Sequence, residues 1–301
     1  MIRPLLKWAG GKRQLLPILR PYYPDRFTRY VEPFFGSGAV FFDLYAMGRL
    51  KGRQAWLVDD NVDLMGCYFA VCRDVERVID MLAELEAGHR DGGDAHFYEV
   101  RDGRFNRERQ RFLAHRDAKR YTAELAAMLI YLNRTGFNGL FRLNARGAFN
   151  VPVGRYTNPR ICEPAHLREV ARALSAPGVH LIHGPFDQAL AGCGRGDLVY
   201  CDPPYAPISA TSRFTSYTAS GFTAADQSRL QQSLIAASRR GAQVLLSNST
   251  APLIRQLYTS SDAKRANLRT RRISARRSIN SRASARGPVQ EFLITNLACR
   301  L

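Results

Sequence analysis

One stretch near the N-terminus restricts the fold more than any other, because it alternates a strand, a glycine turn, a helix and a second strand. Residues 29–32 form a short extended run that stops at Pro33, and residues 39–47 after the glycine turn have a helical pattern. Residues 55–58 are apolar and end in the polar run 59–61. Such a unit predicts a parallel sheet and therefore an α/β fold.

The middle of the chain follows a different pattern. Residues 62–164 contain no strand–helix alternation, and we expect helices at 62–86, 96–106 and 122–133. Alternation resumes afterwards: we predict strands at 179–182, 197–201 and 242–247 and a helix at 223–239. An antiparallel pair of strands at 268–273 and 289–296 is predicted to close the sheet. We therefore predict one domain from 1–61 and 165–301 that carries an inserted domain at 62–164.

Charge points to a polyanionic partner. The chain has 44 Lys and Arg against 26 Asp and Glu, a formal net charge of +18. The segment 263–290 has no acidic residue but nine basic ones, and each phosphate that such residues neutralise releases counterions. This clustering favours nucleic acid, although a membrane surface or a solvated face gives the same pattern.

Other partners and cofactors receive little support. No apolar run approaches a membrane span or a signal peptide, so we expect a cytoplasmic protein. None of the six cysteines forms a C-x-x-C pair or has a histidine at ligand spacing. We therefore expect neither a metal site nor disulfides.

The glycine turn at residues 32–38 predicts a ligand site. Glycines let the backbone approach a ligand closely, and the N-terminus of the following helix favours a carboxylate. Asp59, at the end of the next strand, is placed to bind a ribose diol. The motif differs from G-x-G-x-x-G and no phosphate-binding lysine follows, which favours an adenosyl ligand without phosphates.

A second motif, Asp202-Pro203-Pro204-Tyr205, follows the buried-type strand 197–201. The prolines stiffen the loop and lack backbone donors. Asp202 and the Pro203 carbonyl could accept both hydrogens of an exocyclic amine and aim its lone pair at an electrophile, while Tyr205 could stack on a flipped-out base. The alternative is a rigid turn with an aromatic plug.

These motifs are similar to those of the Dam-type family of DNA adenine methyltransferases, in the order of its alpha arrangement. The matching segments are 7–12, 31–38, 59–61, 131–142, 147–156, 202–205 and 277–279. The resemblance implies a Rossmann-like class I methyltransferase sheet of seven mostly parallel strands. It also implies that the inserted helical domain recognises the DNA target.

The resemblance further implies that S-adenosylmethionine is the cofactor. Its predicted contacts are Trp8, Lys12, Phe35, Gly36, Gly38, Asp59, Phe186 and Asp202. Lys12 would bind the methionine carboxylate. The family often places an acid before an aromatic residue after the third strand, and here that acid would be displaced to Asp187.

For DNA the resemblance implies duplex GATC as the target. Lys7 and Arg142 would read guanines, Leu140 and Pro152 would touch the thymine methyl group, and Phe137 would wedge into the base stack. Further DNA contacts are expected from Asn138, Arg134, Arg155, Arg276 and Arg277. Without the resemblance, residues 137–156 read as an ordinary polar hairpin.

Several alternatives stay open at this point. The Asp202 motif would equally suit methylation of cytosine N4, an RNA base or a glutamine side chain. A catalytically inactive DNA-binding relative is the alternative from another class, and the intact motifs argue against it. The oligomeric state is open, with a monomer compatible with the family, and so is the existence of a partner restriction endonuclease.

Overall fold

The computed structural model describes residues 2–8, 10–115, 117–207, 221–276 and 288–299. It contains a seven-stranded sheet in the order β3-β2-β1-β4-β5-β7-β6. The strands are β1 (Arg29–Glu32), β2 (Gln54–Asp59), β3 (Val179–His183), β4 (Asp197–Cys201), β5 (Gln243–Ser249), β6 (Arg269–Arg276) and β7 (Pro288–Thr295). The predicted α/β fold with a mostly parallel seven-stranded sheet is confirmed.

By its internal contacts the chain divides into two compact units. The helical unit comprises Met1–Gly11, Gly36–Gly38 and Asn61–His183, and the sheet unit comprises Lys12–Phe35, Ala39–Asp60 and Gly184–Leu301. The predicted insertion at 62–164 lies within the helical unit, whose boundaries are wider. The predicted division into domains stays a prediction.

In the sheet unit, the strand order reverses between β1 and β4, which makes this position the topological switch point of the sheet. β1 pairs in parallel with β2 on one side and with β4 on the other, and β4 pairs in parallel with β5. Strand β1 connects to β2 through α2 (Ala39–Ala46), and β4 connects to β5 through α9 (Ala224–Arg239). Right-handed crossovers place these two helices on opposite faces. Ligands bind at such a switch point, outside the carboxyl ends of the strands.

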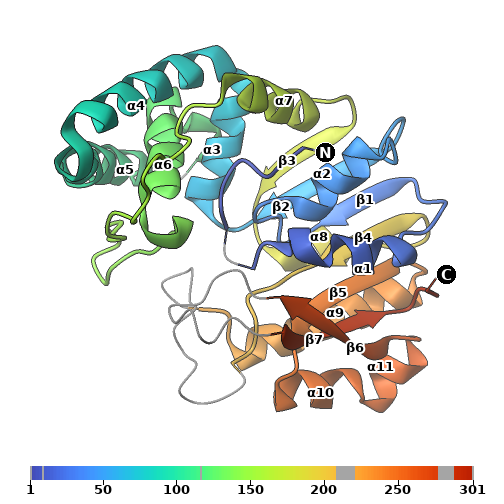
Figure 1. Ribbon diagram of the computed structural model, residues 1–301. Helices are drawn as coiled ribbons and strands as arrows, with labels where there is room; N and C mark the ends of the chain where they lie inside the picture. Colours follow the sequence, from blue (N-terminus) through green and yellow to red (C-terminus); the bar gives the residue numbers. More distant parts are fainter. Residues whose placement is uncertain (1, 9, 116, 208–220, 277–287, 300–301) are drawn as a thin grey trace. The chain divides into compact units, whose positions relative to one another are not determined.

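The remaining elements of the sheet unit complete its two helical layers. Helices α10 (Pro252–Tyr258) and α11 (Ser261–Arg265) pack against α9 (Figure 1), as does α8 (Phe186–Ala191). The short α1 (Leu16–Leu19) contacts α2. Strand β7 closes the sheet antiparallel to both β5 and β6, and every residue of β4 is buried. The switch point therefore lies beside the most buried strand.

The helical unit is built around α6 (Ala123–Thr135), whose residues are nearly all buried. Around it lie α3 (Val62–Arg73), α4 (Val75–Tyr98), α5 (Asn106–Leu113) and α7 (Pro164–Leu174), with a π-helix at Glu99–Phe105 between α4 and α5. The stretch 62–86 is helical as predicted, but it belongs to two helices and not to one. It breaks at Asp74, which has φ −153° and caps α4 by accepting a hydrogen bond from the Arg77 amide.

A buried ion pair joins α5 to α3 inside this unit. The Arg109 guanidinium donates to both carboxylate oxygens of Asp63 at 2.8 and 2.7 Å, and to the Gly147 carbonyl. The Tyr121 hydroxyl donates to the same carboxylate. Because a bidentate arginine–carboxylate pair fixes two planes relative to each other, Arg109 anchors the hairpin that contains Gly147.

Candidate functional site

A buried lysine contacts the loop that follows β4. Asp202 comes directly after the strand, and its Oδ1 lies 2.8 Å from Nζ of Lys12, which is 6% exposed. The same ammonium lies 4.7 Å from the centroid of the Tyr205 ring. Lys12 begins the short 3-10 helix Lys12–Leu15. One buried cation therefore contacts both the acid and the aromatic residue of the motif.

The charge state of Asp202 follows from this setting. Burial raises the pKa of Asp202 to about 6, Lys12 opposes this rise, and the Glu291 carboxylate adds to it. At neutral pH the carboxylate is therefore ionised and can only accept hydrogen bonds. It can accept a hydrogen bond from a donor such as an amine.

The Tyr205 side chain is fixed at its hydroxyl end. The hydroxyl donates a 2.7 Å hydrogen bond to Oε2 of Glu291, which lies on β7 and is 8% exposed. Burial raises the pKa of Tyr205 well above its ordinary value, so the phenol keeps its proton. Glu291 was not predicted, because nothing local marks an acid in the last strand of the sheet as the partner of a residue 86 positions away.

Two carbonyls of the loop are already occupied. The Gln227 amide donates to the Pro204 carbonyl at 2.9 Å, and Asn248 in turn donates to Gln227 at 3.0 Å. The Ser249 hydroxyl donates to the Ala206 carbonyl at 2.7 Å. Within the described part of the chain, no donor reaches the Pro203 carbonyl. Beside Asp202, this carbonyl is thus an acceptor for an external donor.

A second carboxylate, that of Glu32, lies at the switch point, at the end of β1. Glu32 ends β1, is buried, and accepts a 2.7 Å hydrogen bond from the Tyr30 hydroxyl. Burial raises the pKa of Glu32 well above its ordinary value. The Phe35 amide donates to the Val58 carbonyl at 2.8 Å, which ties the turn to β2. The sequence analysis gave Glu32 no role of its own.

The predicted cofactor residues of the sheet unit have distinct settings. Asp59 ends β2 and is partly exposed. Phe186 stacks on Phe34 with ring centroids 5.3 Å apart. The Phe35 ring instead packs in the core against Phe41 and Phe42. The Asp187 carboxylate pairs with Arg229 at 2.6 Å, which turns it toward α9.

The other predicted cofactor residues belong to the helical unit. Trp8 stacks on Phe141 with ring centroids 5.5 Å apart. Gly36 and Gly38 have φ of 50° and 68°, which favour glycine. The Gly36 carbonyl accepts a hydrogen bond from the Tyr68 hydroxyl at 2.9 Å.

Lys7, the predicted guanine reader, is held by its main chain. The Asn133 carboxamide accepts from the Lys7 amide and donates to the Lys7 and Gly139 carbonyls, each at 2.8 Å. The exposed ammonium of Lys7 lies 4.4 Å from the centroid of the Tyr156 ring. A Cβ at Gly139 would lie 2.6 Å from the Lys7 side chain. Asn133 was not predicted, since a buried asparagine in an apolar helix gives no local sign of what it binds.

The second residue predicted to contact guanine, Arg142, lies on the predicted hairpin. Arg142 is exposed, and its Nε and Nη2 donate to Oδ1 and the carbonyl of Asn150 at 2.8 and 3.1 Å. Phe137 is 39% exposed, and its amide donates to the carbonyl of the exposed Pro152 at 2.8 Å. These contacts fix the direction of the Arg142 side chain and bring Phe137 next to Pro152.

The remaining predicted DNA residues lie in varied settings. Asn138 and Leu140 are partly exposed and Arg155 is exposed. Arg134 differs from its prediction, because it is buried and donates to the Arg160 and Ile161 carbonyls and to Glu163. It braces the end of α6. Arg276 ends β6, and its side chain lies outside the described residues, as does the whole of Arg277.

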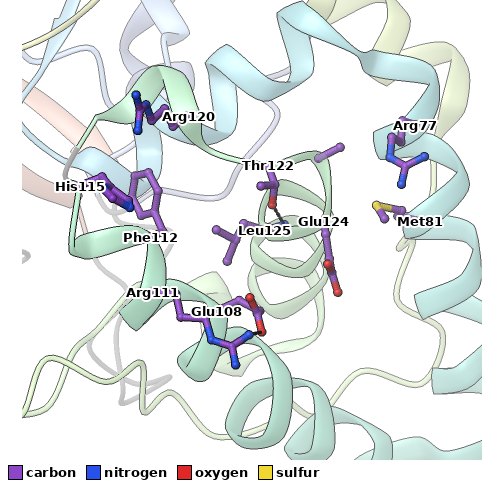
Figure 2. Close-up of a pocket in the computed structure, with 11 residues that line it drawn as sticks. Arg77, Met81, Glu108, Arg111, Phe112, His115, Arg120, Thr122, Glu124 and Leu125 are labelled. Carbon is purple, nitrogen blue, oxygen red and sulfur yellow. Dashed lines mark hydrogen bonds and ion pairs between the residues drawn. The ribbon is translucent and has the colours of Figure 1, made fainter.

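A separate cavity of about 560 Å³ opens in the helical unit between α4, α5 and the start of α6 (Figure 2). Arg77, Arg111 and Arg120 contribute basic side chains to it, and Glu108 and Glu124 contribute acidic ones. None of the predicted site residues lines this cavity. Among the described residues, no group of three or more His, Cys, Asp or Glu side chains could hold a metal ion. None of the described helices has the length and apolar character that crossing a membrane requires.

Comparison with known proteins agrees with this geometry. A family model of the D12 class N6 adenine-specific DNA methyltransferase matches residues 8–273. The chain is 35% identical to the type II methyltransferase M1.LlaDCHI of Lactococcus lactis, over 98% of this chain and 95% of that one. It is 34% identical to the DNA adenine methylase of Escherichia coli K12, over 97% and 94%. It is also 36% identical to the DNA N-6-adenine-methyltransferase of phage P1, over 97% of this chain and 35% of that one.

Proposed function

We propose a mechanism and a target sequence from one premise: the chain belongs to the D12 class of N6 adenine-specific DNA methyltransferases. The enzyme transfers a methyl group from S-adenosylmethionine to the N6 amino group of adenine in DNA. When bound, the cofactor supplies an electrophilic methyl group on a sulfonium. The chain itself must bind and orient the adenine and the cofactor.

Asp202 and the Pro203 carbonyl are proposed to hold the amino group of the target adenine. The N6 lone pair of adenine is delocalised into the ring, so the nitrogen is a weak nucleophile. Two acceptors that bind its two hydrogens favour a pyramidal nitrogen with a directed lone pair. The carboxylate also stabilises the positive charge that develops on N6. The observation that carries this proposal is the Pro203 carbonyl, which accepts no hydrogen bond from any residue that the structure describes, beside an ionised Asp202 and next to loop carbonyls that are occupied.

Tyr205 is proposed to stack on the flipped-out adenine. Its phenol is anchored to Glu291, and Lys12 lies toward one face of its ring. A stacking base would lie on the opposite face. In this arrangement the rate enhancement comes from positioning rather than from proton transfer.

The cofactor is proposed to bind at the carboxyl ends of β1 and β2. Asp59 suits the ribose hydroxyls, and the aromatic faces of Phe34 and Phe186 suit an adenine ring. Lys12 suits a carboxylate, although its ammonium also contacts Asp202. Trp8, Gly36 and Gly38 stay predicted contacts on the family resemblance, and Phe35 is proposed to contribute through its backbone.

The target is proposed to be GATC. Lys7 and Arg142 would read the guanines, and two asparagines support this: Asn133 fixes the main chain of Lys7, and Asn150 fixes the direction of the Arg142 side chain. Leu140 and Pro152 would touch the thymine methyl group, Phe137 would enter the base stack, and Asn138 would add a polar contact. Arg155 and the basic run that starts at Arg276 would bind phosphates. A DNA substrate also favours a location in the cytoplasm of the host cell.

Methylation of genomic DNA that lacks adenine methylation tests this proposal, with single-molecule mapping of the modified bases. We expect N6-methyladenine in GATC on both strands. Methylated adenine in another sequence would overturn the GATC assignment but not the chemistry. N4-methylcytosine as the sole product would overturn the proposed role of Asp202 and Pro203 toward adenine.

A further inference from the structure

The hydroxyl of Tyr205 lowers the pKa of the neighbouring Asp202, and it also donates a hydrogen bond to a residue from a distant part of the chain. Its partner, Glu291, lies on β7 opposite Ser249 of β5 and Ile273 of β6, so the sheet fixes its main chain from both sides. The Oε2 atom accepts the Tyr205 hydroxyl at 2.7 Å. A hydrogen bond of this length is short and directional, and a phenol keeps its O–H bond close to the ring plane, so this contact restrains the orientation of the ring.

The other contacts of the loop do not set the angle of the Tyr205 ring. Gln227 and Ser249 hold the carbonyls of Pro204 and Ala206, which fixes the main chain on either side of Tyr205. Main-chain contacts leave the side-chain torsions free. Lys12 lies 4.7 Å from the ring centroid and attracts the ring without a directional bond. The hydroxyl contact therefore fixes the position of the hydroxyl end of the ring and, because the phenol O–H bond lies near the ring plane, restrains that plane.

Burial indicates that this carboxylate has a specific use. Glu291 is 8% exposed on a strand whose neighbouring positions Phe292, Leu293 and Ile294 are apolar and buried. A carboxylate is costly to bury unless it is hydrogen-bonded. A phenylalanine in place of Tyr205 would remove the need for it, yet the chain retains both groups.

We propose that Glu291 is a positioning residue for methyl transfer, which fixes the Tyr205 ring at the angle required to stack on the flipped adenine. This inference rests on the proposed stacking role of Tyr205. Glu291 does not contact the base and takes no proton from it. Its effect on the ring passes through the Tyr205 hydroxyl, and kcat is compared above pH 7, where its separate effect on the pKa of Asp202 leaves that carboxylate ionised.

A double-mutant cycle with Tyr205→Phe tests this inference. Tyr205→Phe keeps the ring and removes the hydroxyl, and Glu291→Ala removes the acceptor. We expect each to lower the kcat of methyl transfer about 10- to 100-fold, the range expected when a reacting group is misplaced. The KM for DNA and the Kd for S-adenosylmethionine should change less than about threefold. Combining both changes should lower kcat no further, because both break the same contact.

Conservative and control variants separate positioning from folding. Glu291→Gln keeps an acceptor oxygen and should restore kcat to within about threefold of the wild type. Gln290→Ala, at an exposed position on the same strand, should leave kcat unchanged. If Glu291→Ala does not fold, Glu291→Met removes the acceptor with little change in volume and takes its place in the cycle.

The outcomes distinguish this inference from the function on which it rests. If Tyr205→Ala methylates DNA at the wild-type rate, the proposed stacking role is wrong. If Tyr205→Ala is inactive but Tyr205→Phe is fully active, stacking stands and the role of Glu291 is overturned. Additive losses in the double variant would also overturn it, because Glu291 would then act by another route.

Discussion

The ammonium of Lys12 lies 2.8 Å from Oδ1 of Asp202, at the carboxyl end of the central strand β4. The sequence predicts that both residues contact the cofactor and that Asp202 also binds the amine, but it does not predict that they pair. The pair matters for the chemistry, because burial favours the neutral acid whereas a nearby cation favours the carboxylate. Lys12 therefore helps to keep Asp202 in the form that accepts an amine.

The first prediction concerns pH. Burial raises the pKa of Asp202 to about 6, and the ionised form is the one that accepts hydrogen bonds. We expect kcat/KM for methylation of a duplex oligonucleotide to be level above pH 7. It should fall about tenfold per pH unit well below pH 6, as the free enzyme takes up a proton. A kcat/KM that stays level down to pH 5 would contradict this role.

The second prediction concerns Lys12, which opposes the rise in the pKa of Asp202. Lys12 lowers the pKa of Asp202, so Lys12→Met should raise it further and move the acid limb of the kcat/KM profile to higher pH. The position of the limb separates this effect from weaker cofactor binding, which lowers the whole profile. Arg13→Met, at the exposed neighbouring position, should leave the limb in place. An unmoved limb in the Lys12 variant would show that the ion pair does not set the pKa.

The third prediction concerns base recognition. Asn133 fixes the main chain of Lys7 through two hydrogen bonds, so Asn133→Ala should reduce discrimination at the guanine assigned to Lys7. We expect a loss of about 1–3 kcal/mol for Lys7→Ala and a smaller loss at the same base pair for Asn133→Ala. The measurement is kcat/KM on GATC duplexes with one base pair replaced.

A matched variant completes this test. Asn158→Ala, at an exposed position of the helical unit, should discriminate like the wild type. If Asn133→Ala also discriminates like the wild type, Asn133 does not position Lys7. A loss at every base pair rather than at one would indicate general damage to the unit.

The fourth prediction concerns stability. Asp63 and Arg109 are both buried, so Asp63→Ala leaves an unpaired buried cation and should lower the free energy of unfolding by about 3–5 kcal/mol. Denaturant unfolding measures this change. Asp91→Ala, at an exposed position of α4, should change it by less than about 0.5 kcal/mol. A similarly small change for Asp63→Ala would show that the pair does not anchor the helical unit.

Local patterns account for what the sequence predicted well. The apolar run before Asp202 forms the buried strand β4, and Thr223 caps α9 in a capping box with Asp226. Both depend only on neighbours in the chain. The count of seven strands came from the family resemblance, and the strand order was not predicted, since strands 268–273 and 289–296 carry no sign of where they insert.

Long-range partners account for what the sequence did not predict. Asp74 ends one helix and starts the next inside a run of helical periodicity. In the sequence, nothing distinguishes Arg134 from an exposed arginine that contacts DNA. In the structure it is buried, and its guanidinium donates hydrogen bonds to Glu163 and to two carbonyls. Glu291 and Asn133 act on residues 86 and 126 positions away. The roles assigned to the site residues stay predictions.

The most direct test of the central role given to Asp202 is a single-turnover measurement of methyl transfer by Asp202→Ala on a GATC duplex. Cofactor binding is measured on the same sample, and Asp262→Ala, at an exposed position, serves as an acid-to-alanine control within the sheet unit. We expect the Asp202 variant to bind S-adenosylmethionine but to transfer methyl about 10²- to 10³-fold more slowly, with the control near the wild-type rate. Transfer at the wild-type rate by Asp202→Ala with the cofactor bound would contradict this account.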